Sequence, residues 1–171
     1  MTYFEQFGLP LQLKVDKQLL RKRYLELSRQ HHPDYFVNKG AAEQEKALES
    51  SALLNKGLKT LGDADETIRY VLELKGLITE EEKYTLPPAF LMQVMEVNEE
   101  LAEMEPGDDA RREGIEQQLE TLEKEIYEPV KEIIENYSEG HTSEQALLQV
   151  KHYYFQKKYL DRLRGQLSGK S

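Results

Sequence analysis

The sequence predicts an all-α protein, with an N-terminal helical hairpin and a C-terminal three-helix bundle. Of its 171 residues, 32% are charged and 39% are hydrophobic, while only 10 are glycine and 6 are proline. This composition is typical of soluble proteins made of long amphipathic helices. Apolar residues also recur at spacings of three and four along most of the chain, which is the period of one helix face. A chain of this length can form one ordinary domain or two small ones.

The sequence of residues 1–76 predicts four helices, and the second and third of these form the hairpin. A short helix near residues 3–7 precedes a break at Gly8-Leu9-Pro10, and Asp16 is a suitable N-cap for the next helix. Pro33 ends that helix, because the residue before a proline is pushed out of the helical region. The two hairpin helices carry matching apolar stripes: Leu20, Tyr24, Leu27 and His31 in the first, and Ala47, Ser51, Leu54, Leu58 and Leu61 in the second. Stripes joined by a short connection predict antiparallel packing.

Asp63 predicts the start of a further helix, and Gly76 predicts its end. We interpret residues 77–87 as a linker that ends at Pro87-Pro88, with Pro88 in the first turn of the next helix. Three periodic segments follow, near residues 88–104, 109–138 and 142–167. An antiparallel bundle is the simplest way to bury three such stripes, and Pro129 should kink or split the middle helix. The expected domains are residues 1–76, the linker 77–87 and residues 88–171.

Charge and composition exclude several classes of function. The formal net charge is −9, which argues against non-specific binding to nucleic acid or to an anionic membrane. Residues 1–75 carry 12 basic and 11 acidic side chains, whereas residues 76–171 carry 11 and 21. This difference suggests two units with different partners. No apolar run approaches the roughly 20 residues of a membrane-spanning helix, and the first residues lack the pattern of a secretory leader. We therefore expect a cytoplasmic protein.

The stretch "HHPDYF" at residues 31–36 raises the question of a metal or catalytic site. The chain has four histidines and no cysteine, and three or four converging ligands are needed to hold a metal. His31 lies on the apolar stripe and is expected to be packed, while the bend at Pro33 should turn His32 and Asp34 outward rather than toward each other. A nucleophile elbow of the G-x-S-x-G type is missing. We expect no metal, no cofactor and no enzymatic activity.

Two surfaces of the predicted bundle carry more apolar residues than its core needs. In the segment 88–104 the core stripe is complete with Phe90, Val94, Val97, Leu101 and Met104. Off that stripe lie three apolar and three acidic residues: Leu91, Met92, Met95, Glu96, Glu99 and Glu103. Methionine is suited to adaptable binding surfaces. In the last helix Leu148, Phe155 and Tyr159 lie away from the core stripe. The alternative is that a bundle helix contacts two neighbours and needs a wide apolar face.

A helical hairpin with His32-Pro33-Asp34 at its tip resembles the J domain of co-chaperones that stimulate the ATPase of DnaK-type chaperones. The neighbouring sequence "ALLNKGLKTLGD" and the pair Arg69-Tyr70 fit this resemblance. Three further segments, "YFEQFGLP", "HHPDYF" and "AFLMQVMEVNEELAEME", are similar to HscB, the J protein family of iron–sulfur cluster assembly. The resemblance covers nearly the whole chain, and the three segments occur in the right order. Eukaryotic members of that family carry a tetracysteine module, so a chain without cysteine is similar to the bacterial type.

The resemblance implies a two-part adaptor, with residues 1–76 as the J domain and residues 88–171 as the client-binding bundle. The tripeptide His32, Pro33 and Asp34 would contact a DnaK/HscA-type ATPase chaperone, assisted by basic residues of the preceding helix: Arg21, Lys22 and Arg29. Position 35 is Tyr where many J domains have Lys, which removes one expected charge. The client would be an IscU-type iron–sulfur scaffold protein, bound by Leu91, Met92, Met95, Glu96, Glu99, Glu103 and Phe155.

Two other interpretations stay open at this point. The bundle could bind a different client or serve as a general partner of DnaK. Alternatively, the chain could be a helical interaction protein whose J loop is inactive. Failure to bind an IscU-type scaffold would favour the first alternative. Failure to stimulate single-turnover ATP hydrolysis by a DnaK-type chaperone would favour the second.

Overall fold

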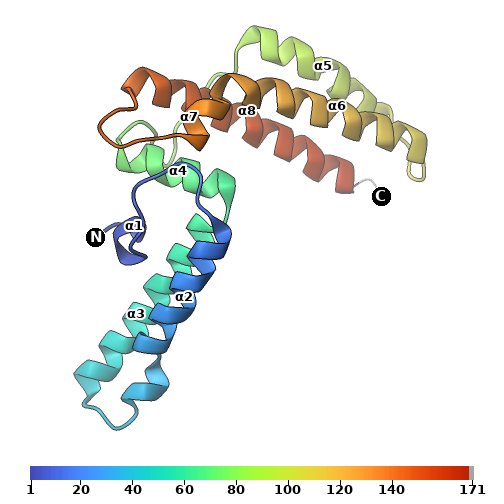
Figure 1. Ribbon diagram of the computed structural model, residues 1–171. Coiled ribbons are helices and arrows are strands. Elements are labelled where there is room, and N and C mark those ends of the chain that lie inside the picture. The colour runs from blue at the N-terminus through green and yellow to red at the C-terminus, as the bar shows by residue number, and fades with distance from the viewer. Residues whose placement is uncertain (170–171) are drawn as a thin grey trace. The chain divides into compact units, whose positions relative to one another are not determined.

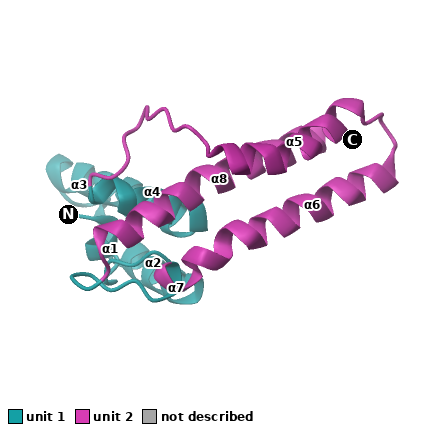
Figure 2. Cartoon of the chain, turned by 90° about the horizontal axis from the view of Figure 1, so that it is seen from above, with its two compact units in different colours: residues 1–75, 134–141 teal, residues 76–133, 142–171 magenta. Residues whose placement is uncertain are grey.

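The structure is a computed structural model in which residues 1–169 are described. Within these residues all regular secondary structure is helical, which confirms the predicted fold class. The contacts divide the chain into two compact units (Figure 2). The first comprises residues 1–75 and 134–141, and the second comprises residues 76–133 and the chain from Thr142 onward. No helix in the described part is long and apolar enough to cross a membrane.

The first unit is built on an antiparallel pair of helices (Figure 1). Its elements are α1 (Tyr3–Gln6), α2 (Lys17–His31), the 3₁₀ turn η1 (Pro33–Phe36), α3 (Ala41–Leu61) and α4 (Ala64–Leu74). The Asp16 side chain accepts hydrogen bonds from the backbone N–H groups of Gln18 and Leu19, and the Asp63 side chain caps α4 by accepting one from the N–H of Glu66. The helix ends therefore lie where the capping residues and Pro33 predicted them.

The core of the first unit lies at the base of the hairpin, away from its tip. It consists mainly of Phe4, Phe7, Leu13, Leu20, Leu54, Leu61, Ile68, Val71 and Leu72. Farther along the hairpin, Tyr24, Leu27 and His31 are only partly buried. His31 is therefore covered only in part, because two helices with no third layer cannot fully enclose a side chain at the end of their contact.

The second unit is a bundle of three long helices in which α6 runs antiparallel to α5 and α8 (Figures 1 and 2). Its elements are α5 (Pro88–Glu103), α6 (Asp109–Tyr127), the 3₁₀ turn η2 (Glu128–Val130), α7 (Lys131–Glu135), whose last residues join the first unit, and α8 (Glu144–Gly169). Pro88 occupies the first turn of α5, as predicted. The break at η2 confirms that Pro129 interrupts the middle helix; its ring cannot continue the helical hydrogen bonds.

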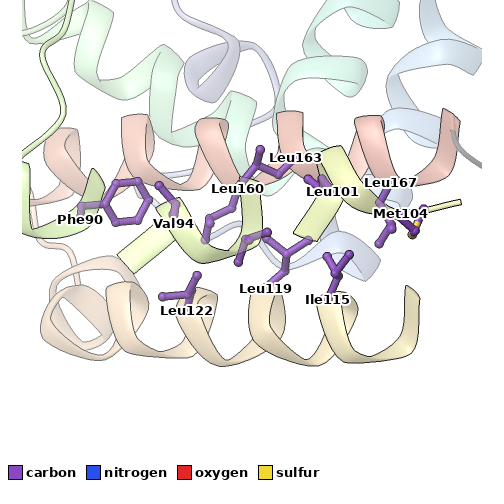
Figure 3. Close-up of a cluster of buried hydrophobic side chains, with 11 residues drawn as sticks. Phe90, Val94, Leu101, Met104, Ile115, Leu119, Leu122, Leu160, Leu163 and Leu167 are labelled. Carbon is purple, nitrogen blue, oxygen red and sulfur yellow. The ribbon is translucent and has the colours of Figure 1, made fainter. Parts of the chain in front are cut away.

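The bundle core extends along all three helices (Figure 3). Its buried members are Phe90, Val94, Val97, Leu101, Met104, Ile115, Leu119, Leu122, Leu160, Leu163 and Leu167. The entire predicted stripe of α5 is buried. The core stripe expected for the last helix is also buried, with Val150, Tyr153, Leu160, Leu163 and Leu167. The opposite face of α5 is therefore not needed for the core.

Residues 134–141 lie between α7 and α8 in sequence but belong to the first unit. Lys14 Nζ lies 3.4 Å from Glu135 Oε1, and Lys75 pairs with Glu139, which also accepts a hydrogen bond from the Tyr137 hydroxyl. The hydrogen bond from Lys75, followed by that from Tyr137, lowers the pKa of Glu139. The predicted domain boundaries stay a prediction, because contacts do not measure which segments fold independently.

Candidate functional site

The first candidate site is the tip of the hairpin, where α2 gives way to η1. His32 has extended backbone angles (φ −66°, ψ 131°), and Pro33 opens the 3₁₀ turn. The His32 Nδ1 atom accepts a hydrogen bond from the Asp34 backbone N–H at 3.2 Å. His32 thereby serves as the N-cap of η1, in the position where a side-chain acceptor satisfies a free backbone donor. The first turn of the bend is thus capped by a residue of the tripeptide itself.

The bend presents an imidazole and a carboxylate together to solvent. The side chain of His32 is 49% exposed and that of Asp34 is 84% exposed, with Asp34 Oδ2 only 3.4 Å from His32 Nδ1. The expectation that both groups face outward was correct, but the expectation that they face away from each other was wrong. The hydrogen bond from the Asp34 N–H draws the two side chains to one side. Exposed polar groups outside any enclosed cavity are suited to recognition by another protein.

Two polar side chains of α3 hold the tip in place. Gln44 Nε2 donates to the carbonyl oxygens of Val37 and Lys39, both at 2.9 Å. The Ser51 hydroxyl donates to the carbonyl of His31 at 3.2 Å. This hydrogen bond satisfies one of the backbone carbonyls left free at the end of α2. The tip is thus ordered by hydrogen bonds and has little apolar burial.

The three basic residues predicted to assist the tip, Arg21, Lys22 and Arg29, are all exposed on α2. None of them forms an ion pair with another described residue. Glu26 is also exposed between Lys22 and Arg29, so the positive field of this helix face is interrupted. The face is available for contact with an acidic partner surface, and its role stays a prediction.

The second candidate site is the outer face of α5, which we call the α5 patch: Leu91, Met92, Met95, Glu96, Glu99 and Glu103. Leu91 is 42% exposed, Met92 is 72% exposed and Met95 is 55% exposed. The three glutamates are also exposed. The spacing from Met92 through Glu96 and Glu99 to Glu103 places them along one side of the helix. Because the core stripe on the other side is completely buried, this face is held in a defined position by packing.

Phe155, the remaining predicted client-binding residue, is only partly buried and has an aromatic neighbour that the sequence did not indicate. Its ring stacks on that of Tyr84, with centroids 4.4 Å apart and planes at 4°. The Tyr84 hydroxyl is hydrogen-bonded to His152 Nδ1, and burial raises the Tyr84 pKa. The only sequence signal for this contact was the one aromatic residue of the linker at residues 77–87.

Tyr159 connects the Phe155 region of α8 to α5. Its ring meets Phe90 edge-on, with centroids 6.0 Å apart, and its hydroxyl accepts a hydrogen bond from Asn98 Nδ2 at 2.9 Å. Phe155 and Tyr159 both line a groove of about 760 Å³ together with Tyr84 and Leu86. Sequence analysis placed Phe155 and Tyr159 off the core stripe of α8 but did not predict this groove.

Across residues 1–169, no three His, Asp or Glu side chains come together in a way that could hold a metal ion. His32 and Asp34 are close, but two groups are fewer than the three or four ligands that a protein metal site requires.

Comparisons with known proteins show which family this chain resembles. Residues 86–168 match the family model described as the HSCB C-terminal oligomerisation domain. The crystal structure of human co-chaperone protein HscB superimposes with a TM-score of 0.82 and 27% identity, covering 99% of this chain and 82% of the human chain. Chaperone HscB from Vibrio cholerae gives a TM-score of 0.80 and 25% identity, covering 98% of this chain and 96% of its own.

Proposed function

We propose that the chain, which is similar to HscB co-chaperones over nearly its whole length and matches their C-terminal family model, binds an IscU-type iron–sulfur scaffold protein and delivers it to a DnaK/HscA-type ATPase chaperone. In this proposal the His-Pro-Asp tip stimulates ATP hydrolysis by the chaperone, and the α5 patch binds the scaffold. The protein itself makes and breaks no covalent bond. The observation that carries the proposal is that one chain displays both an exposed tripeptide tip and an exposed apolar–acidic helix face.

The geometry of the tip supports its role as the contact for the chaperone. His32 and Asp34 extend from a bend whose backbone already has hydrogen bonds within the bend and from Ser51 of α3. A partner can therefore engage both side chains without first breaking the secondary structure. Arg21, Lys22 and Arg29 on the adjoining helix would meet an acidic surface, and such contacts chiefly steer association and fix its orientation.

The composition of the α5 patch supports its role as the contact for the scaffold. Three exposed apolar side chains on one helix face are unusual in a chain that can bury its core without them. The flanking carboxylates would contact donors and cations of the client, while the apolar centre would supply most of the affinity. We place Phe155 with Tyr84 at the edge of the same interface.

Binding both partners through one chain would promote transfer of the client. Once the scaffold is held by the bundle and the chaperone by the tip, their encounter becomes effectively intramolecular. This effect can raise apparent affinity by about 10²–10⁴-fold without new contacts. The chaperone would then hydrolyse ATP and close on the delivered scaffold.

Single-turnover ATP hydrolysis by a DnaK/HscA-type chaperone tests the proposal directly. The wild-type chain should accelerate hydrolysis, and an IscU-type scaffold should accelerate it further. Asp34→Asn should abolish the acceleration by the chain while leaving scaffold affinity unchanged. The double variant Leu91→Ala with Met95→Ala should behave in the opposite way, with weaker scaffold binding and unchanged stimulation in the absence of scaffold.

Each outcome separates the proposal from its alternatives. Stimulation that persists in Asp34→Asn would show that the tripeptide is inactive. A chain that stimulates the chaperone but binds no IscU-type scaffold would be a J-domain protein with another client. Equal scaffold affinity in the wild type and the double variant would refute the α5 patch.

A further inference from the structure

The groove beside Phe155 differs in charge from the rest of the bundle. Its aromatic and apolar walls come from Tyr84, Leu86, Phe155 and Tyr159, and its charged residues are Glu82, Lys83, Lys158, Asp161 and Arg162. Residues 76–171 have an excess of ten acidic side chains (21 against 11). A concentration of basic groups around an aromatic wall is therefore a local exception.

The acidic residues of the groove are already neutralised. Glu82 Oε1 lies 2.7 Å from Lys151 Nζ. Asp161 is bracketed by Lys157 Nζ at 2.8 Å and Arg164 Nη1 at 3.0 Å. Because each carboxylate is paired with a cation that does not line the groove, the two contribute little net negative charge to it.

The basic residues of the groove lack counter-ions. Lys83, Lys158 and Arg162 are exposed, and none forms an ion pair with a described residue. The Arg162 guanidinium lies over the Tyr159 ring, 5.2 Å from its centroid. This cation–π contact holds the guanidinium beside the groove but does not neutralise its charge. Glu80 and Glu81 are close in sequence but do not line the groove. Three cations of the lining therefore have no ion-pair partner among the described residues, whereas both carboxylates of the lining are paired with other cations.

The groove is preformed, because three contacts hold one wall against α8. Lys151 pairs with Glu82, His152 is hydrogen-bonded to the Tyr84 hydroxyl, and Phe155 stacks on Tyr84. A preformed wall lowers the entropic cost of binding, since the side chains are already ordered.

We propose that this groove binds an acidic segment of the client protein, in which carboxylates flank an apolar or aromatic side chain. The apolar side chain would occupy the cleft between Tyr84, Phe155 and Tyr159, and the carboxylates would pair with Lys83, Lys158 and Arg162. This inference rests on the proposed function, because the segment belongs to the client that the α5 patch binds.

The groove and the α5 patch would together determine the direction in which the client binds. Leu86, in the groove, lies just before the start of α5, and Tyr159 contacts Phe90 in the first turn. The glutamates of the α5 patch extend toward the other end of the helix, to Glu103. The second unit thus has a basic aromatic end and an acidic end on either side of an apolar centre. A client with the opposite order of charges would fit in one orientation only, since reversal would place like charges together.

The test compares the full-length wild type with Lys158→Glu/Arg162→Glu. Binding of a fluorescein-labelled IscU-type scaffold is followed by fluorescence anisotropy at about 0.05 M and about 0.5 M salt. The double variant should bind about tenfold more weakly at low salt and lose most of the salt dependence. The control Lys124→Glu/Lys131→Glu makes the same change in net charge on exposed residues outside the groove and should bind as the wild type does.

A second probe separates failure of this inference from failure of the proposed function. A labelled, terminally blocked octapeptide of alternating Glu and Leu should bind the wild type and the control, but not Lys158→Glu/Arg162→Glu; a Lys–Leu peptide should not bind the groove. If the scaffold binds wild type and groove variant equally, the groove inference is overturned while the proposed function stands. If no scaffold binds the wild type, the proposed function and the client assignment both fail, and the octapeptide alone decides the chemistry of the groove.

Light scattering distinguishes binding of a client segment from binding of a second copy of this chain. A second copy of this chain could offer its own acidic α5 patch to the groove. A dimer mass for the wild type that falls to the monomer mass in Lys158→Glu/Arg162→Glu would assign the groove to self-association and overturn the client assignment. Circular dichroism spectra identical to those of the wild type are expected for both double variants, because all four substituted side chains are exposed.

Discussion

The hairpin and the bundle are both made of amphipathic helices, but they bury their apolar faces to different extents. In the bundle the stripe of α5 is buried from Phe90 to Met104, so the outer face of the helix rests on a continuous core. In the hairpin, burial is concentrated at the base, and Ala47 is the one buried residue on the distal part of α3 before Leu54. The tip depends instead on hydrogen bonds from Gln44 and Ser51.

This difference indicates that the two candidate sites are held in position by different means. The α5 patch is preorganised by close packing, which is insensitive to solvent and costly to disturb. The tip is positioned by exposed hydrogen bonds, each with a modest net contribution to stability. Segments with few apolar contacts open locally at low free energy. We therefore expect the bundle to present a rigid surface and the tip to adapt when a partner binds.

The largest expected effect comes from removing a core side chain of the bundle. Leu160 is completely buried, and Leu160→Ala should lower the free energy of unfolding by about 2–5 kcal/mol, because the cavity would not be refilled. The control Leu148→Ala, on the same helix but 36% exposed, should lower it less, by about 1 kcal/mol, because part of this side chain is already in water. Urea denaturation followed by circular dichroism measures both. Similar losses in the two variants would mean that the continuous core does not dominate bundle stability.

The next effect concerns the base of the hairpin, where α3 and the N-terminal segment pack closely. A Cβ atom at Gly57 would lie 2.7 Å from Phe7 Cε2 and 3.2 Å from Tyr3 Cδ1. Gly57→Ala should therefore destabilise the first unit by about 1–3 kcal/mol through overpacking. Gly114→Ala, in α6, brings the new Cβ within 4 Å of no neighbour outside its own stretch of helix and should instead stabilise by about 0.5–1 kcal/mol. A neutral Gly57→Ala would show that the base of the hairpin yields more easily than its burial suggests.

A smaller, local effect is expected at the tip. Gln44→Ala removes two hydrogen bonds to the loop carbonyls, each with a net contribution of about 1 kcal/mol or less at an exposed site. Hydrogen exchange of amides in residues 34–40 should accelerate several-fold, with no change in the bundle. The control Gln149→Ala, exposed on α8, should alter neither region. Unchanged exchange at the tip would contradict the view that these hydrogen bonds order it.

The smallest effect is a pH dependence of the contact between Lys75 and residues 137–139. The pKa of Glu139 is lowered in the folded protein, so its contribution to stability is present above its ordinary pKa of 4.5 and is lost as the pH falls through the lowered value. As the pH is lowered from about 5, the wild type should lose slightly more stability than Glu139→Gln does. Thermal melts across this range measure the difference. The control Glu132→Gln, at an exposed position of α7, should retain the wild-type pH dependence.

The sequence allowed accurate prediction of features that depend on local chemistry or on helical period. Asp16, Pro33 and Gly76 marked helix ends because a cap, a missing N–H and a left-handed backbone act within a few residues. The stripe from Phe90 to Met104 predicted the core side of α5, because burial in a three-helix bundle follows the period of each helix. The same helical period placed the residues of the α5 patch on the opposite, exposed side of α5.

Features that depend on contacts between distant segments were not predictable in this way. The stacking of Tyr84 on Phe155 joins residues that are far apart in sequence, and helical period says nothing about a linker that has no helix. The partial exposure of His31 was missed because the stripe indicates which face is inward but not how many layers cover it. The approach of Asp34 to His32 was missed because it depends on one backbone hydrogen bond within the bend.

The assignment of residues 134–141 to the first unit means that the polypeptide passes between the two units three times, near residues 75, 133 and 141. A protease that cuts the exposed stretch at residues 79–81 would therefore leave the two fragments associated under native conditions, although a denaturing gel would resolve two bands. Expressing residues 1–75 alone would remove the partners of Lys14 and Lys75. Dissecting this molecule by simple truncation would thus create an artificial surface on the excised piece.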